Sequence, residues 1–374
     1  MLLQLIFWLS LGLLAWTFAI YPALVILIAG RSFRRTRASS YRPRVTVVMV
    51  CYNEAARLPK RIDNLLNTDY PHELLDIVLV SDGSSDDTED VVQQIGDPRL
   101  RLIARSERTG KAGCLNVGVE KAKGEIIVFC DARQTFNRQT IPRLIDRFPR
   151  DGKRMPIGAV SGRLEIAEGG GGMAEGVGAY WKLERRLREA EGMLDSTIGC
   201  TGAVYAVRRE LYRPIPDDTL LDDVVIPMQI LCDGSRVVLE PYAHAFDPQE
   251  LSSDREENRK RRTLAGNVQM LLRHPQWLLP WRNRCLIQLI SHKYMRMAGP
   301  FCLLAAAVTN VLLLSHRFYL LLGIVQLLCY VLALIGARGG PRPARLAASF
   351  LFLNLQVVRG IYYYFFGNWR SGWK

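Results

Sequence analysis

Two short apolar runs, each ending at an aspartate, constrain the fold of this chain most. Residues 77–80 read Ile-Val-Leu-Val and lead through Ser81 to Asp82, and residues 126–130 read Ile-Ile-Val-Phe-Cys and lead to Asp131. Apolar runs of this length, with helical sequence between them, are typical of buried parallel strands. Because open parallel sheets bind ligands at their carboxyl edge, the two aspartates predict a site there for a hydroxyl-rich or metal-bound ligand.

The neighbouring sequence extends this pattern to a doubly wound α/β domain. Residues 44–51 are rich in β-branched side chains and predict a buried first strand, and residues 100–104 predict a third short strand. Helices are expected over residues 58–67 and 113–122. Strands that alternate with helices in this way are typical of the α/β class.

The second half of the sequence is less regular. The expected elements are a helix over 174–191, a glycine-containing loop that enters a strand over 198–207, a helix that opens with Asp222 and Asp223, a β-like run over 235–240 and a basic helical run over 255–270. Gly202 lies in the glycine-containing loop. We expect these elements to belong to the same domain as the parallel strands.

The distribution of positive charge along the chain is typical of a membrane protein rather than of a nucleic-acid-binding protein. The 374 residues carry a formal net charge of +13. Six arginines lie directly behind an apolar segment over residues 2–30, at positions 31, 34, 35, 37, 42 and 44. Such clusters are typical of the cytoplasmic flank of a membrane span. Basic residues interleaved with base-stacking aromatics are not evident, so no nucleic-acid partner is predicted.

Four apolar segments predict a multi-pass membrane protein. The first, residues 2–30, is longer than the 7–15-residue core of a secretory signal and has no basic residue before it, so we expect a retained anchor. The other three cover residues 297–314, 318–336 and 346–366. Each is near the roughly 20 residues that are needed to cross a bilayer.

Charge placement predicts how these spans are oriented. With the N-terminus outside, residues 31–296 and the basic link 337–345 lie in the cytoplasm, beneath the plasma (inner) membrane. The last span is interrupted by Asn354, Gln356 and Arg359. An arginine within a span is costly unless it faces protein or water.

These observations divide the chain into four expected parts. They are an N-terminal anchor (1–30), a cytoplasmic α/β domain (43–267), an interfacial amphipathic segment (268–296) and three C-terminal transmembrane helices (297–366). The interfacial segment mixes apolar residues with arginines and with Trp277 and Trp281, a composition typical of a helix in a membrane interface. The eight cysteines form no CxxC pair and no zinc spacing, so we expect a reducing compartment and no thiolate metal site.

Taken one at a time, the candidate site residues allow two interpretations. Asp82 or Asp131 alone could be a turn residue, although their pairing at neighbouring strand ends favours a ligand site. Lys111 lies between glycines but lacks the phosphate-loop pattern, so it is either a diphosphate ligand or a surface lysine. Asp222 and Asp223 could act in a cleft or could simply complement a helix dipole. The basic run from Arg259 to Arg262 could be a solvated face.

Five sequence blocks, taken together, resemble the family 2 glycosyltransferases. The resemblance covers about residues 43–270 and is closest to the membrane-embedded polysaccharide synthases, which include cellulose, hyaluronan, poly-N-acetylglucosamine and chitin-oligosaccharide synthases. The blocks are Cys51-Tyr-Asn-Glu54, Val80-Ser-Asp-Gly-Ser-Ser-Asp86, Gly110-Lys-Ala-Gly113 with Asn116, Phe129-Cys-Asp131-Ala and Leu221-Asp-Asp223. Five blocks in the right order are far more specific than any one of them.

The resemblance implies a GT-A (nucleotide-diphospho-sugar transferase) fold and an inverting transfer from a nucleotide sugar. It implies that base and ribose are bound by Tyr52, Glu54 and Asp82, and that Lys111 and Asp131 lie at the diphosphate. Asp131 matches the first acid of a metal motif that binds Mg²⁺ or Mn²⁺. Asp223 matches the general base. Arg262 matches the arginine of the Gln-x-x-Arg-Trp block, which supports the leaving diphosphate. Further candidates for acceptor or diphosphate support are Gly202, Asp222 and Arg259.

The sequence departs from the family pattern at two places. Arg133 stands where a second metal-binding aspartate is usual, so Asp131 and the diphosphate would hold the metal with one protein carboxylate. Arg133 could also share in neutralising the diphosphate. Thr263 and Arg259 replace the tryptophan and glutamine of the Gln-x-x-Arg-Trp block, so the acceptor site is expected to differ from that of the processive synthases.

The function predicted is that of a membrane-bound inverting glycosyltransferase in polysaccharide biosynthesis. It would transfer a sugar from a nucleotide donor, a UDP-sugar, to a saccharide or lipid-linked acceptor, with the bilayer as its third partner. One alternative is a transferase that adds a single sugar to a polyprenyl-linked acceptor, which Thr263 favours. The other is a non-catalytic membrane protein that binds sugar nucleotides. The sequence does not name the sugar, the linkage or partners in export or polymerisation.

Overall fold

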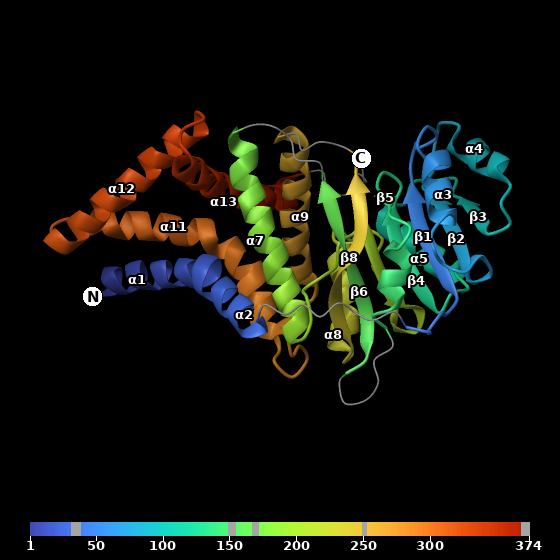
Figure 1. The fold of residues 1–374 in the computed structure, drawn as a ribbon. Helices are drawn as coiled ribbons and strands as arrows, with labels where there is room; N and C mark the ends of the chain where they lie inside the picture. Colours follow the sequence, from blue (N-terminus) through green and yellow to red (C-terminus); the bar gives the residue numbers. More distant parts are fainter. Residues whose placement is uncertain (31–38, 149–154, 167–171, 249–252, 368–374) are drawn as a thin grey trace.

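A computed structural model of the protein describes residues 1–30, 39–148, 155–166, 172–248 and 253–367. The arginines at 31, 34, 35 and 37, on which the predicted basic flank depends, lie outside the described residues. Figure 1 shows a sheet domain at one end of the molecule and a group of long helices at the other. Two further helices, α7 (Gly172–Leu194) and α9 (Ser253–Arg273), stand between these two parts.

The first half of the sheet has the parallel arrangement expected from the sequence. Its four strands lie in the order β3-β2-β1-β4, and each pairs in parallel with its neighbours. Their bounds are Val45–Cys51 (β1), Leu75–Ser81 (β2), Leu100–Ala104 (β3) and Ile126–Asp131 (β4). The helices between them are α3 (Leu58–Leu66), α4 (Thr88–Ile95) and α5 (Lys111–Lys121). Because the register pairs Val50 with both Val80 and Asp131, the strand ends meet at one edge.

The second half of the sheet is mixed. Strand β7 (Val204–Arg208) runs antiparallel to β4, and β6 (Ile157–Ile166) is antiparallel to β7 and parallel to β8 (Arg236–Asp247). The short β5 (Thr135–Phe136) pairs with β8 and is the edge strand of the eight-stranded sheet. Strand β6 was not predicted from the sequence, and β8 is longer than the run expected over 235–240. This half brings β7, and with it the glycine-containing loop, beside β4.

Helices cover both faces of the sheet and create two apolar cores. On one face α3 and α6 (Thr140–Ile145) pack through side chains such as Leu58, Ile62 and Leu144. On the other face α5 and α8 (Asp222–Cys232) pack together with Trp277 and Cys285 from the segment that precedes the long helices. The second core therefore fixes α8 against both the sheet and the membrane-side part of the chain.

In the part of the chain that the structure describes, four helices are long and apolar enough to cross a membrane. They comprise residues Leu2–Ala29, Leu286–Leu312, Arg317–Ala337 and Arg342–Phe366. The first is a continuous run of α1 (Leu2–Ala15), a π-helical turn (Trp16–Ile20) and α2 (Tyr21–Ala29). The second begins at 286 and not at 297, because α10 (Leu286–Leu289) and a π-helical turn (Ile290–Tyr294) lead directly into α11 (Met295–Leu312). Their number agrees with the sequence, and their orientation stays a prediction.

The polar residues of the last apolar helix face protein. In α13 (Arg342–Phe366), Asn354 and Gln356 are buried, and Arg359 forms an ion pair with Glu257 of α9. Further along this contact, Gly360 lies so close to Leu264 that an added Cβ would come within 2.4 Å of the leucine Cβ. Arg359 itself stays 48% exposed, and its ion pair with Glu257 reduces the cost that the arginine would carry in a span.

Candidate active site

A lysine and three aspartates meet at the carboxyl edge of the sheet. Lys111 opens α5 directly after Gly110, whose positive φ of 89° allows the sharp turn into the helix. Its Nζ lies 3.0 Å from Oδ1 of Asp131 at the end of β4 and 3.5 Å from Oδ2 of Asp222 at the start of α8. The structure thus brings together the end of one strand and the starts of two helices that are far apart in the sequence.

The charges of this cluster reinforce the protonated state of Lys111. Burial acts to lower the pKa of the ammonium, but the carboxylates of Asp131, Asp222 and Asp223 outweigh it, so the pKa is raised. Oδ2 of Asp222 is buried and accepts no hydrogen bond from the described residues. Asp131 and Asp222 both lie within 3.5 Å of the ammonium, so two carboxylates share one lysine at this point of the edge.

Asp223 is the carboxylate best suited to accept a proton. Burial and the neighbouring charge of Asp222 raise its pKa to about 6, while Lys111, Lys293 and Arg262 act in the opposite direction. Its side chain lies against Gly202, where an added Cβ would come within 3.0 Å of Asp223 Oδ2. The carbonyl of Asp223 accepts a 2.7 Å hydrogen bond from the Cys200 amide. The glycine-containing loop thus contacts Asp223 directly.

Asp82 organises the loop that leads to Lys111. It is fully buried, and its carboxylate accepts hydrogen bonds from the amides of Thr109 (2.7 Å) and Gly110 (3.0 Å). Cys114 of α5 donates its thiol to the same carboxylate at 3.2 Å. In the structure Asp82 therefore fixes the turn before α5, and its predicted contact with ribose or base remains untested.

Tyr52 and Glu54 lie at the neighbouring strand end. The guanidinium of Arg108 stacks over the Tyr52 ring at 3.8 Å from its centroid. Glu54 pairs with Arg57 at 2.6 Å, and its amide donates to Thr88 Oγ1. The aromatic ring, the arginine and Asp82 thus occupy one end of the edge, where the sequence predicts the nucleoside.

Arg133 points to a partner that the sequence did not suggest. Its guanidinium forms an ion pair with Asp247 at the end of β8, with a 2.8 Å contact between Nη2 and Oδ2. The side-chain amide of the buried Gln134 donates to the same oxygen at 2.9 Å. The role of Arg133 beside the diphosphate stays a prediction.

The two basic residues predicted from α9 differ in their surroundings. Arg262 is exposed and forms no hydrogen bond or ion pair with the described residues, yet its charge lowers the pKa of Asp223. Arg259 is partly buried, and its carbonyl accepts a hydrogen bond from Thr263 Oγ1 at 2.9 Å. Arg262 is therefore available to an anion near Asp223.

Two cations near the base were missed by the sequence interpretation. Arg188 of α7 donates to Thr201 Oγ1 at 3.3 Å and to the Gly199 carbonyl at 3.4 Å, so it supports the loop against which Asp223 lies. Lys293, in the turn before α11, contributes charge that acts on Asp223. Neither residue belongs to a motif, and only tertiary contacts reveal them.

The donor set at the edge fits a divalent cation that is shared with a ligand. Among the described residues, no three His, Cys, Asp or Glu side chains are grouped to hold a metal by themselves. Asp131 is 30% exposed, and the carboxylates outnumber the lysine. Magnesium commonly takes one or two protein carboxylates and completes its shell with phosphate and water. Asp131 together with a diphosphate satisfies that requirement.

Comparison with known proteins agrees with this geometry. The model of glycosyl transferase family 2 matches residues 46–212, which include β1, the parallel strands, Lys111, Asp131 and Gly202. The chain carries a family 2 glycosyltransferase domain. The matched region ends before Asp222, so the family match covers the donor edge and the glycine-containing loop but not α8.

Two relatives are glycosyltransferases that build different products. The beta-monoglucosyldiacylglycerol synthase of Trichormus variabilis is 24% identical over 96% of this chain and 79% of its own length. The poly-beta-1,6-N-acetyl-D-glucosamine synthase of Staphylococcus aureus is 23% identical over 53% of this chain and 48% of its own length. This protein is therefore a glycosyltransferase, and its relatives do not agree on an acceptor.

A solved structure establishes the fold. The mannosyltransferase from Pyrobaculum calidifontis, determined in complex with GDP-Man and Mn²⁺, superimposes with a TM-score of 0.74 at 23% identity. The match covers 98% of this chain and 99% of that chain. The expected GT-A fold is confirmed, and the likeness extends over the long apolar helices as well as the sheet.

Proposed function

We propose that this protein is a membrane-bound inverting glycosyltransferase that uses a nucleotide-sugar donor, a UDP-sugar, and an acceptor hydroxyl at the cytoplasmic face of the plasma membrane. The observation that carries the proposal is Asp223. It is a carboxylate with a pKa of about 6, beside the Lys111–Asp131 pair and against Gly202. A base with a pKa slightly below neutral is mostly ionised at pH 7 and still accepts a proton readily.

The remaining groups fit the two ends of a nucleotide diphosphate. Tyr52, Glu54 and Asp82 bind the nucleoside, and Lys111 donates to the diphosphate as it becomes a leaving group. Arg262, which has no partner among the described residues, adds a second cation on the side of α9. A divalent ion at Asp131, when bound, neutralises developing charge on the diphosphate. The Mn²⁺ and GDP-Man bound by the Pyrobaculum mannosyltransferase support this class of ligand.

The placement of the helices supports a membrane-surface acceptor. Helices α7 and α9 lie between the sheet and the long apolar helices, and α7 carries Arg188, which binds the loop beside Asp223 (Figure 1). An acceptor that reaches Asp223 from this side approaches along the membrane face. This proposal places the sheet domain in the cytoplasm and uses the predicted division 1–30, 43–267, 268–296 and 297–366.

Two acceptor classes follow from the comparisons. A growing saccharide would make the protein a polysaccharide synthase, as the resemblance to poly-N-acetylglucosamine synthases suggests. A single addition to a lipid or lipid-linked sugar is supported by the match to the glucosyldiacylglycerol synthase, which extends over 96% of the chain and so includes the apolar helices. Thr263, in place of the tryptophan of processive enzymes, also favours the single addition.

One experiment tests the reaction and separates these acceptors. The purified full chain, supplied with membrane lipid extract, is screened with radiolabelled UDP- and GDP-sugars in the presence of Mg²⁺ or Mn²⁺. The proposal expects one donor to give product whose new linkage, determined by nuclear magnetic resonance, has the opposite anomeric configuration to the donor. A product with retained configuration would contradict it. One added sugar on lipid identifies the single-addition enzyme, and a ladder of oligomers identifies the polymerase.

A further inference from the structure

A pocket of about 260 Å³ lies between the end of α8 and the 3-10 turn η4 (Pro275–Leu278), away from the carboxylate cluster. Its lining includes Arg213, Gln229, Asp233, Trp277 and Arg282. The residues come from three segments that are far apart in the sequence. Nothing in the proposed transfer reaction uses this pocket.

Two of the residues that line the pocket are arginines. Arg213 pairs with Asp233 at 2.8 Å. The side chain of Arg282 is exposed and forms no hydrogen bond or ion pair with the residues that the structure describes. His274 stacks on Trp277 at 4.1 Å, and burial together with the charge of Arg273 lowers its pKa, so it adds no charge at pH 7. The lining thus has a net positive charge and one unpaired cation.

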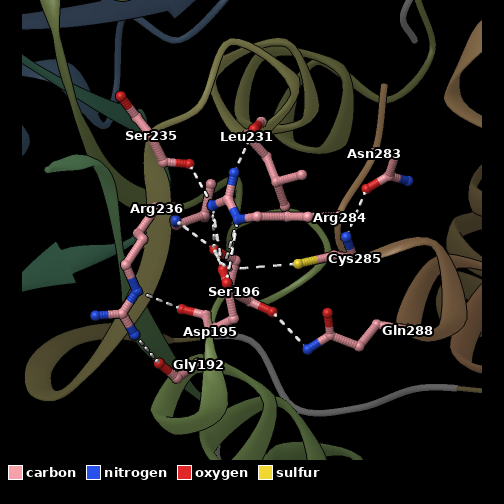
Figure 2. A network of polar contacts seen from close by, with 11 residues as sticks. Gly192, Asp195, Ser196, Leu231, Ser235, Arg236, Asn283, Arg284, Cys285 and Gln288 are labelled. Carbon is pink, nitrogen blue, oxygen red and sulfur yellow. Dashed lines mark hydrogen bonds and ion pairs between the residues drawn. The ribbon is translucent and has the colours of Figure 1, made fainter. Parts of the chain in front are cut away.

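The wall that carries Arg282 is fixed by the network in Figure 2. Arg284 donates at 2.8 Å to the carbonyls of Leu231 and Ser235, and its guanidinium also pairs with Asp195. Asn283 adds a 3.0 Å bond to the Trp277 carbonyl. Because Arg284 donates to the Leu231 carbonyl in the last turn of α8, its positive charge partly neutralises the negative end of that helix beside the pocket. These contacts fix the backbone around the pocket, so the pocket has a defined shape.

Its surroundings place the pocket at a membrane surface. The candidate span Leu286–Leu312 begins directly after Arg284 and Cys285. Trp281, adjacent to Arg282 in the sequence, is 76% exposed, and Ile287, in the first turn of the candidate span, is 69% exposed. Tryptophan and arginine at the end of a span are typical of the interface with lipid head groups, and basic residues there attract anionic lipids.

We propose that this pocket binds the phosphate of an anionic phospholipid head group, with Arg282 as the principal donor and Arg213 as the second. The bound lipid docks the end of α8 and η4 on the bilayer. The required chemistry is a phosphate diester in a head group of net negative charge, as in phosphatidylglycerol but not in phosphatidylcholine. A soluble phosphate could mimic it, but the exposed Trp281 and Ile287 favour a lipid because they would contact its acyl chains. The proposal is independent of the donor, the acceptor and the direction of sugar transfer.

The test uses the full chain in a neutral detergent and follows its thermal unfolding. Dioctanoyl phosphatidylglycerol, dioctanoyl phosphatidylcholine and inorganic phosphate are titrated separately, and the Kd is taken from the concentration dependence of Tm. We expect stabilisation by phosphatidylglycerol alone. Each arginine at an anionic surface contributes about 1 kcal/mol, so Arg282→Gln should weaken binding about fivefold and the double variant with Arg213→Gln about 25-fold.

Arg338→Gln is the matched control, because Arg338 is exposed in the link after α12 and does not line the pocket. It should bind phosphatidylglycerol as the parent does. An equal loss in Arg338→Gln and Arg282→Gln would mean general charge attraction and would overturn the site. Equal protection by inorganic phosphate, or by phosphatidylcholine, would overturn the assignment to an anionic lipid. Since Arg282 has no protein partner among the described residues, Arg282→Gln should fold even if the double variant does not.

Discussion

The donor edge and the base side of this active site are built in different ways. At the donor edge each residue follows its own strand or opens its own helix, as Asp82, Lys111 and Asp131 do. On the base side Asp223 depends on Gly202 in the preceding loop, and that loop depends on Arg188 of α7. The first side is specified by short local motifs, whereas the second is specified by packing between distant segments.

This difference predicts how the two sides respond to substitution. Changes at the donor edge should alter nucleotide binding and local charge, because those residues act directly. Changes on the base side should alter the rate of transfer with little effect on donor affinity, because they move or remove one carboxylate.

The largest effect is expected for Asp223→Asn. Loss of a general base commonly costs 10²- to 10⁴-fold, so the transfer rate should fall about 10³-fold. Thermal stability should be kept or increased, because burial and Asp222 already disfavour the ionised form of Asp223. The measurements are single-turnover transfer, Tm and calorimetric binding of UDP. A variant with near-parental rate would remove Asp223 from the mechanism, and a tenfold loss of UDP affinity would break the division between the two sides.

Lys111→Met should reduce kcat/KM about 10²-fold through weaker donor binding. Without the ammonium, Asp131, Asp222 and Asp223 repel each other and the diphosphate. Tm should fall at pH 8 and recover as the pH is lowered, since protonation of Asp223 relieves the repulsion. Lys121→Met, at the exposed end of the same helix, is the control and should match the parent. Parental donor affinity in Lys111→Met would show that Lys111 is a structural cation only.

Gly202→Ala should reduce kcat about tenfold and leave the donor KM unchanged. The added methyl would lie 3.0 Å from Asp223 Oδ2, closer than ordinary contact, so the carboxylate must shift. Gly192→Ala is the control, because its methyl would meet the chain only at 3.4 Å. If both variants turned over at the parental rate, the contact between the loop and Asp223 would not matter for the reaction.

The smallest effects are expected for Arg133→Ala and Asp247→Ala. Because the two side chains pair with each other, each variant should change the affinity for UDP with Mg²⁺ by less than about threefold, and the double variant should resemble the singles. Calorimetry measures this. A large loss in Arg133→Ala but none in Asp247→Ala would show that Arg133 leaves its partner to bind the diphosphate, as the sequence allowed.

The same contrast explains what could be predicted from the sequence. Strands β1, β2 and β4 and the edge they form were predicted, because an apolar run followed by an aspartate is a local signal. The pair between Arg133 and Asp247 was not, since it depends on the register of β8 against β5 and β6. Strand β6 was missed for a related reason, because both of its partners, β7 and β8, lie later in the chain, beyond α7.

The membrane part shows a similar limit. Four apolar segments were predicted and four candidate spans are present, but the second starts earlier than expected. Arg359 looked costly from the sequence because its partner, Glu257, lies on a helix about a hundred residues away. The interfacial segment expected over 268–296 is divided among the end of α9, η4, α10 and a π-helical turn, and α7 and α9 pack against the apolar helices as well.

The pH dependence of kcat/KM tests the role of Asp223 most directly. Since its pKa is raised to about 6, lowering the pH through 6 protonates the carboxylate and removes the base. We predict that log kcat/KM is level between pH 7 and 8 and falls with unit slope below a midpoint of about 6, and that the residual activity of Asp223→Asn lacks this limb. A level profile down to pH 5, or the same limb in Asp223→Asn, would contradict the assignment of Asp223 as the base.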